Sequence, residues 1–176
     1  MIKYGVIKDK KFFEFLKKNL SLLFTIHDSL FTDVIHRCAE IKAEVVSKDE
    51  YETKGLRAIL NFGHTFGHAI ENLTGYKAMS HGQGVAIGMN LACNLGVKMG
   101  MFSAAEKEEV EKLLKNAGLP VGFDFKKYDF KKVLSVLSRD KKVIDASLRF
   151  VVPKKIGEVV VVKDVSLCLI KEVIGK

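Results

Sequence analysis

The sequence predicts a mainly α-helical domain with a small antiparallel β-hairpin near its C-terminus. Apolar residues recur at helical spacing along most of the 176 residues, and two segments rich in β-branched residues flank a short Pro- and Gly-containing stretch. A nucleotide-binding sheet requires strands that alternate with helices, and the sequence shows no such alternation. The length suits one domain with a substantial core, so residues 1–176 are expected to form a single unit.

The first half of the chain contains two predicted helices. Residues 10–20 form a short amphipathic segment, and residues 28–48 carry one apolar stripe that includes Val34, Cys38 and Ile41. Residues 49–55 are polar and interrupt the helical pattern. A further helix is expected over residues 61–73, where Thr74 and Gly75 end it.

The helix predicted over residues 81–100 is unusually apolar. Asn90, Asn94 and Lys98 interrupt it at helical spacing, which favours a buried helix over a membrane span. Small residues recur every four positions, a row that indicates close packing against another backbone (Gly84, Gly88, Ala92, Gly96). Residues 82–88 resemble a dinucleotide fingerprint only faintly, and we reject that interpretation because no strand precedes them.

The C-terminal third combines two helices, the hairpin and a last helix. Ser103 and Glu106 form a predicted capping box for a helix that ends near Gly118. Asp129 is expected to cap a helix that runs to about residue 139. Residues 148–152 and 158–162 are the predicted strands, joined by residues 153–157, and Asp164 is expected to cap the last helix.

The charge and cysteine patterns argue against nucleic-acid binding and against a cysteine metal or redox site. The net charge is +8, but the lysines are scattered and no nucleic-acid-binding motif is present. A solvated surface explains most of them, with a site for an anionic small molecule as the second interpretation. Cys38, Cys93 and Cys168 lack metal or redox spacing and stand among apolar neighbours, which favours buried thiols in a reducing cytoplasm.

Three of the five histidines lie within eighteen positions and predict a divalent metal site. His64 and His68 are four residues apart, so both rings lie on one helix face, and His81 returns at the start of the next helix. Neutral imidazoles suit zinc, although iron or nickel accepts the same groups. His64 and His81 supply two ligands, whereas His68 is either a third ligand or an acid/base group beside the metal.

Other polar residues near the histidines allow more than one interpretation. Arg57 has the geometry to clamp a carboxylate or phosphate in a bidentate manner. Asn61 either binds a ligand or caps the helix that follows. Lys42 by itself is typical of a solvated surface, and Lys141 follows a helix end, where the helix dipole favours cations.

These residues together resemble the 3-dehydroquinate synthase family. The matching segments occur in family order over nearly the whole chain, and the string from Gly63 to Glu71 (Gly-His-Thr-Phe-Gly-His-Ala-Ile-Glu) is the most specific. The others are residues 2–7, 41–46, 49–50, 55–58, 81–82, 85–89 and 139–142. The resemblance implies the multi-helical C-terminal domain of a dehydroquinate synthase-like fold.

The same resemblance implies an enzyme that uses NAD⁺ and Zn²⁺, or another divalent metal such as Co²⁺. Such enzymes convert 3-deoxy-D-arabino-heptulosonate 7-phosphate into 3-dehydroquinate with loss of phosphate, in the shikimate pathway. Zinc acts as a Lewis acid and NAD⁺ carries the redox chemistry. A cytoplasmic homodimer that contacts neither nucleic acid nor membrane is implied.

Carried over by position, the resemblance assigns His64 and His81 to the metal. It implies that His68, Lys42 and Glu52 are catalytic. Substrate binding is implied for a larger set, in which cations predominate (Lys3, Lys42, Arg57, Asn61, His68, Lys141). The family's third zinc ligand is a glutamate that would stand immediately before Met1, and Gln83-Gly84 replaces the family's usual Glu-Ala.

The family's N-terminal nucleotide-binding domain has no counterpart in this chain. The chain is therefore expected to bind metal weakly and to lack synthase activity until it is combined with such a domain. Two other functions remain open. One is a related sugar-phosphate cyclase such as 2-deoxy-scyllo-inosose synthase, and the other is a non-catalytic helical domain that serves as an assembly surface.

Overall fold

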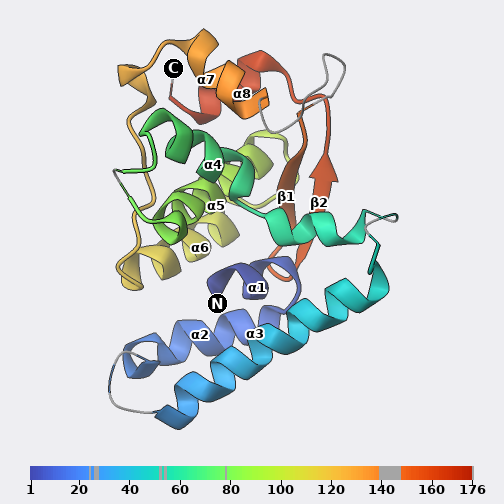
Figure 1. Ribbon diagram of the computed structural model, residues 1–176. Coiled ribbons are helices and arrows are strands. Elements are labelled where there is room, and N and C mark those ends of the chain that lie inside the picture. The colour runs from blue at the N-terminus through green and yellow to red at the C-terminus, as the bar shows by residue number, and fades with distance from the viewer. Residues whose placement is uncertain are drawn as a thin grey trace.

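A computed structural model describes residues 1–23, 25, 28–51, 53, 55–77, 79–138 and 148–175. These residues form helices and one two-stranded sheet, so the predicted fold class is confirmed (Figure 1). The elements in chain order are α1 (Ile2–Ile7), α2 (Lys10–Leu23), α3 (Asp28–Lys48), η1 (Leu56–Asn61), α4 (His64–Leu73), α5 (His81–Lys98), α6 (Ala104–Asn116), η2 (Phe125–Lys127), α7 (Phe130–Ser138), β1 (Phe150–Lys155), β2 (Glu158–Val162) and α8 (Leu167–Val173).

Helix α5 is the centre of the domain, with other elements around it (Figure 1). One face, which includes Val85 and Met89, packs into a core shared with α1, α2, α3 and α6. The opposite face, which includes Ile87 and Leu95, packs into a second core with α4, α7, β1 and α8. A helix that is apolar on all sides is stable only when it is surrounded. Among the described residues, no helix is long and apolar enough to cross a membrane.

Helices α4 and α5 cross with their backbones in direct contact. A Cβ added at Gly88 would overlap the carbonyl oxygen of Gly63 and would lie 2.8 Å from the Gly67 nitrogen. The predicted role of the small-residue row is therefore confirmed. The contact brings the N-terminal turn of α4 against the first half of α5, which places three histidines near one another.

Helix α4 begins three residues later than the periodicity predicts. Residues 56–61 form the separate 3₁₀ helix η1, and Gly63, with φ 80°, stands at the α4 N-cap. Only glycine adopts this left-handed conformation at little steric cost, so the chain turns here before α4 starts. The interpretation of Asn61 as the cap of this helix is wrong, because Asn61 is the last residue of η1.

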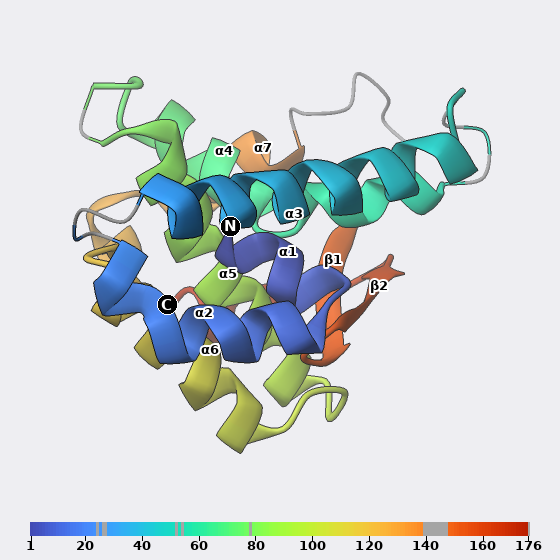
Figure 2. The same ribbon diagram turned by 90° about the horizontal axis from the view of Figure 1, so that it is seen from below.

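Helices α1, α2 and α3 form a layer on one side of the domain, seen from below in Figure 2. Within this layer α1 lies next to the rest of the domain, and the fully buried Val6 of α1 and Phe13 of α2 belong to the core that the layer shares with α5 and α6. The Val6 carbonyl also accepts a hydrogen bond of 2.8 Å from the backbone N–H of Gly157, in the hairpin turn. The long helix α3 has the predicted bounds.

The hairpin and last helix are confirmed, with corrected ends. Strand β1 continues to Lys155, so the connection is the two residues Ile156 and Gly157 rather than residues 153–157. Pro153 is tolerated because a two-stranded sheet has only edge strands. The α8 cap is Ser166, whose hydroxyl accepts from the Leu169 N–H at 3.2 Å. Asp164 instead has φ 57° and lies before the helix.

The three cysteines have free thiols in three different environments. Cys93 is buried, and burial raises the pKa of its thiol well above the ordinary range. Cys38 is half-buried, but Cys168 is exposed on α8, so the expectation of three buried thiols is wrong for this residue. Cys168 lies on the exposed side of a helix whose opposite side carries the buried Ile170 and Val173.

Candidate metal and substrate site

Three imidazoles meet where α4 crosses α5. The ring centroids of His64 and His68 are 5.5 Å apart, those of His64 and His81 are 5.5 Å apart, and those of His68 and His81 are 5.8 Å apart. Two rings about one tetrahedral zinc ion would have centroids about 5 Å apart, given Zn–N bonds of about 2.0–2.1 Å. The rings of His64 and His81 are therefore close enough to share one cation after a small adjustment.

The hydrogen bonds of His64 and His81 leave the same nitrogen of each ring available. Nδ1 of His64 lies 3.2 Å from the Phe62 carbonyl oxygen, and Nδ1 of His81 lies 2.8 Å from Oε1 of Glu71. Both partners only accept, so each neutral ring carries its proton on Nδ1 and leaves Nε2 with a free lone pair. Metal-ligating histidines commonly show this pattern. The donor set therefore fits a divalent cation.

The surroundings of His64 favour the neutral form of its imidazole. Burial lowers the pKa of His64 first, and the nearby Lys3, His68 and His81 lower it further, against an opposing contribution from the Phe62 carbonyl. A lowered pKa keeps the imidazole unprotonated at neutral pH, which is the form that binds a metal.

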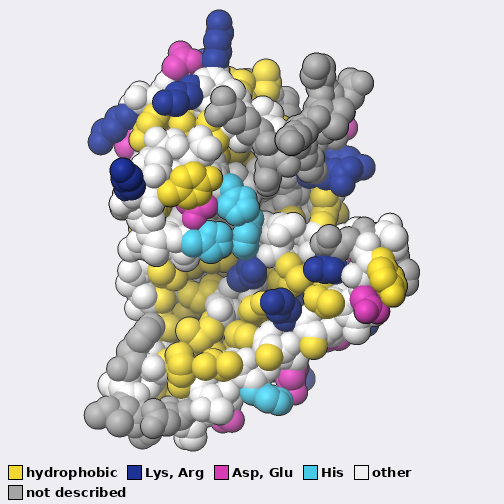
Figure 3. Space-filling view, viewed as in Figure 1, with side chains coloured by type: hydrophobic (Ala, Val, Ile, Leu, Met, Phe, Trp, Pro, Cys, Tyr) yellow, Lys and Arg dark blue, Asp and Glu magenta, His cyan; other side chains and the backbone are white. Residues whose placement is uncertain are grey.

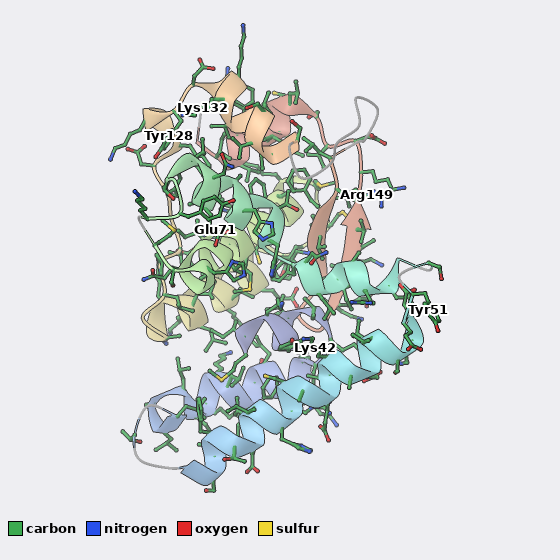
Figure 4. The ribbon with its side chains drawn as sticks, in the orientation of Figure 1. Lys42, Tyr51, Glu71, Tyr128, Lys132 and Arg149 are labelled. Carbon is green, nitrogen blue, oxygen red and sulfur yellow. The ribbon has the colours of Figure 1, made fainter. Side chains whose placement is uncertain are left out.

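A second set of possible donors overlaps the predicted one. His68, Glu71 and His81 each offer an atom, and these atoms lie within 4.8 Å of one another. Glu71 belongs to the quoted family string, but neither the spacing of the histidines nor the resemblance assigns it a role. Its carboxylate is buried and faces the imidazoles (Figure 4). The possible signal was its position, three residues after His68 on the same helix face.

Two lysines from the neighbouring layer add positive charge beside the imidazoles. Lys3, on α1, donates through Nζ to the Leu60 carbonyl at 2.9 Å, which ties α1 to η1. Burial is the main cause that lowers the pKa of Lys3, and the charge of Lys42 on α3 lowers it further. Figure 3 shows lysine or arginine side chains just below the histidines, and Figure 4 places Lys42 on the same open face.

We expect the substitution Lys42→Met to raise the pKa of Lys3. Methionine keeps the length of the side chain but removes the charge that disfavours protonation of Lys3. The measurement is ¹³C NMR of the reductively methylated protein as a function of pH. Lys154→Met is the control, because Lys154 pairs with Glu158 on the exposed hairpin. An unchanged Lys3 titration in Lys42→Met would contradict the coupling.

Arg57 and Asn61 lie on η1, which joins the two layers. The Arg57 Nη1 donates to the Glu50 carbonyl at 3.0 Å, and its backbone N–H donates to Asp49 at 3.3 Å. The buried Asp49 also accepts from the Leu56 N–H at 2.7 Å, so this carboxylate fixes the start of η1. Asp49 belongs to the segments that resemble the family, but the resemblance alone does not assign it this role. Asn61 is exposed at the end of η1.

Two predicted site residues, Glu52 and Lys141, lie outside the described residues. The structure brings His64, His68 and His81 together with Lys3, places Lys42 near Lys3, and places Arg57 and Asn61 on the adjoining 3₁₀ helix.

A cavity of about 450 Å³ opens beside His64 and His81. Its other lining residues come from the N-terminus, α1, α2, α5 and the segment after α6 and are mostly apolar, among them Leu16, Leu20 and Val85. Figure 3 shows this apolar surface directly below the histidines. Polar groups at the rim of an apolar cavity are typical of a small-molecule site.

The N-terminus of α5, which carries His81, is held by a capping box. The Ser80 N–H donates to Oε1 of Gln83 at 2.9 Å, and the Gln83 N–H donates to the Ser80 hydroxyl at 3.4 Å. Glutamine therefore performs the capping role that glutamate performs elsewhere. The replacement noted in the sequence keeps the start of the helix in place and introduces no charge beside His81.

Comparison with known proteins agrees with this geometry. The family model described as 3-dehydroquinate synthase C-terminal matches residues 1–143. The 3-dehydroquinate synthase of Thermodesulfovibrio yellowstonii is 42% identical over 176 residues, which cover 100% of this chain and 48% of the relative. That of Picosynechococcus sp. is 44% identical over 177 residues, covering 99% and 48%. The chain spans about half the length of the curated relatives it matches.

Two solved structures have the same fold. The 2-epi-5-epi-valiolone synthase of Streptomyces hygroscopicus, solved with NAD⁺ and Zn²⁺, superposes with a TM-score of 0.84 at 24% identity, covering 98% of this chain and 47% of that one. A 2-deoxy-scyllo-inosose synthase, solved with carbaglucose-6-phosphate, NAD⁺ and Co²⁺, gives 0.79 at 26% identity, covering 98% and 49%. The chain therefore belongs to the 3-dehydroquinate synthase family, whose C-terminal domain it matches.

Proposed function

We propose that this chain is the metal- and substrate-binding half of a 3-dehydroquinate synthase. The reaction is the conversion of 3-deoxy-D-arabino-heptulosonate 7-phosphate to 3-dehydroquinate with loss of phosphate. The observation that supports the proposal best is the pair of rings of His64 and His81. They lie 5.5 Å apart, both are bonded through Nδ1, and they stand beside the cations of Lys3 and Lys42.

His64 and His81 are the proposed ligands of a divalent ion such as Zn²⁺ or Co²⁺, the metals with which two relatives were solved. When bound, the metal would supply Lewis-acid stabilisation of developing negative charge, and NAD⁺ would supply hydride transfer. The family resemblance implies a third ligand and a site for NAD⁺ in the part of the relatives that this polypeptide does not cover. We therefore expect the isolated 176-residue polypeptide to bind metal weakly and to be inactive.

The chain's own residues bind and orient the substrate and move its protons. Lys3 and Lys42 supply positive charge for the phosphate or carboxylate of the substrate. His68, beside the two metal ligands, is placed to exchange a proton with a substrate hydroxyl. Arg57, Asn61 and Lys141 are assigned to substrate binding, and Glu52 to catalysis, from the family resemblance.

The partner that completes the enzyme is a nucleotide-binding domain equivalent to the part of the relatives that this chain does not cover. We propose that the complete enzyme is a homodimer, as is typical of the family. Three free cysteines are consistent with a reducing cytoplasm as its location.

Reconstitution tests the proposed function. The chain is co-expressed with the N-terminal half of the Thermodesulfovibrio yellowstonii enzyme, and phosphate release and 3-dehydroquinate formation are measured with NAD⁺ and Zn²⁺. Turnover by the pair and none by either half is the expected result. Turnover only with a hexose 6-phosphate would instead assign a cyclase of the 2-deoxy-scyllo-inosose type. If the chain binds no metal at His64 and His81, and if His68→Ala causes no loss of any activity, the chain would instead be assigned as an assembly domain.

A further inference from the structure

We propose that Glu71 is a positioning residue, which holds His81 in one tautomer and one orientation so that its Nε2 faces the proposed metal position. This inference rests on the proposed function, because it concerns how one of the two proposed ligands is held. It concerns a contact between side chains of different helices, α4 and α5, that the sequence comparison leaves without a role.

The burial of Glu71 is the first observation. Its side chain is only 7% exposed, whereas that of His81 is 60% exposed. Removing a carboxylate from water is costly unless it is hydrogen-bonded, and a leucine at this position would join the core without that cost. The Glu71 carboxylate is buried under the His81 imidazole, whose hydrogen bond offsets part of the cost of removing the carboxylate from water.

The direction of the hydrogen bond is the second observation. Oε1 of Glu71 lies 2.8 Å from Nδ1 of His81. A carboxylate accepts, so Nδ1 carries the proton and Nε2 has the lone pair. An exposed imidazole without this bond would rotate about its side-chain bonds and exchange tautomers. Carboxylates that bond ligating histidines in this way are known to raise metal affinity 10- to 100-fold.

The packing around Glu71 is the third observation. A Cβ built at Gly84 would lie 3.4 Å from Cγ of Glu71 and 3.8 Å from its Cδ. The glutamate side chain therefore lies along the α5 backbone, one turn from His81, and α5 in turn begins at the Ser80–Gln83 capping box. Both partners of the hydrogen bond are thus fixed by helices that are in direct contact.

The test uses two substitutions and a matched control in the full 176-residue chain. Glu71→Gln keeps an acceptor but removes the charge, and Glu71→Leu removes both. Asn90→Leu is the control, because Asn90 is equally buried on α5 but donates to the Val121 carbonyl, away from the histidines. The readouts are the Co²⁺ dissociation constant, the visible spectrum of bound Co²⁺ and the His81 tautomer by ¹⁵N NMR of the metal-free protein at pH 8.

We expect Glu71→Leu to weaken Co²⁺ binding 10- to 100-fold and to move the His81 proton from Nδ1 toward Nε2. Glu71→Gln should have a smaller effect on affinity and keep the tautomer and the Co²⁺ spectrum. Asn90→Leu should change neither, although it lowers stability. A His81 tautomer or Co²⁺ affinity unaffected by Glu71→Leu would overturn the inference, as would a Co²⁺ spectrum altered by Glu71→Gln, which would make Glu71 a ligand. If the wild-type chain binds no Co²⁺, the proposed metal site fails, and the tautomer measurement alone then decides the role of Glu71.

Discussion

Replacing Gly88 with alanine is expected to destabilise the domain by at least about 3 kcal/mol, the upper end of the usual cost of overpacking. The new methyl group would overlap the Gly63 carbonyl oxygen and press on the Gly67 nitrogen. Both are backbone atoms, which cannot move aside by a change of rotamer. Helices α4 and α5 would therefore separate, and the three imidazoles with them.

Gly84→Ala, one turn earlier on the same face of α5, is the matched control. Its Cβ would make an ordinary contact with Glu71 at 3.4 Å. Alanine is favoured over glycine in helices, so this variant should be stabilised by up to about 1 kcal/mol. Urea denaturation followed by circular dichroism measures both. Equal midpoints for Gly88→Ala and Gly84→Ala would refute the backbone contact.

His64→Ala is expected to lower kcat/KM of the reconstituted enzyme by a factor of about 10³ or more. Loss of a proposed metal ligand removes Lewis-acid stabilisation that is worth several kcal/mol in the transition state. The half-buried ring also leaves space rather than a new clash, so the fold should survive. Activity and Co²⁺ affinity should fall together.

His36→Ala provides the comparison for His64→Ala. His36 lies on α3, is 73% exposed and pairs with Glu40, so its removal tests the loss of an imidazole away from the site. It should keep activity within about twofold, because exposed pairs contribute at most about 1 kcal/mol. A His64→Ala enzyme with wild-type turnover would remove His64 from the set of metal ligands.

Helical periodicity predicted most of the fold because it is a local property of the chain. The bounds of α3 are as expected, since its apolar stripe and the polar break after it are both visible in the sequence. The start of α4 was wrong because the left-handed turn at Gly63 depends on contact with α5. The predicted end of β1 is wrong because a proline in the sequence favours a loop, although an edge strand accepts Pro153.

The candidate site was predictable in part. Spacing brought His64 and His68 to one helix face, and the return of His81 followed from the turn between two helices. The role proposed for Glu71 could not be read from spacing, because its partner lies on another helix. The proximity of Lys3 and Lys42 is likewise a product of tertiary packing, and only the family resemblance pointed to these residues.

The direct contact between the α4 and α5 backbones has a consequence for motion. Because no side chain separates Gly88 from the backbone of Gly63 and Gly67, the two helices can part only by opening the domain, so their amides should exchange with deuterium at the rate of global unfolding. The lysines stand on α1 and α3, in another layer. We therefore expect the layer that carries the lysines to move when an anion binds, while the imidazoles keep their positions.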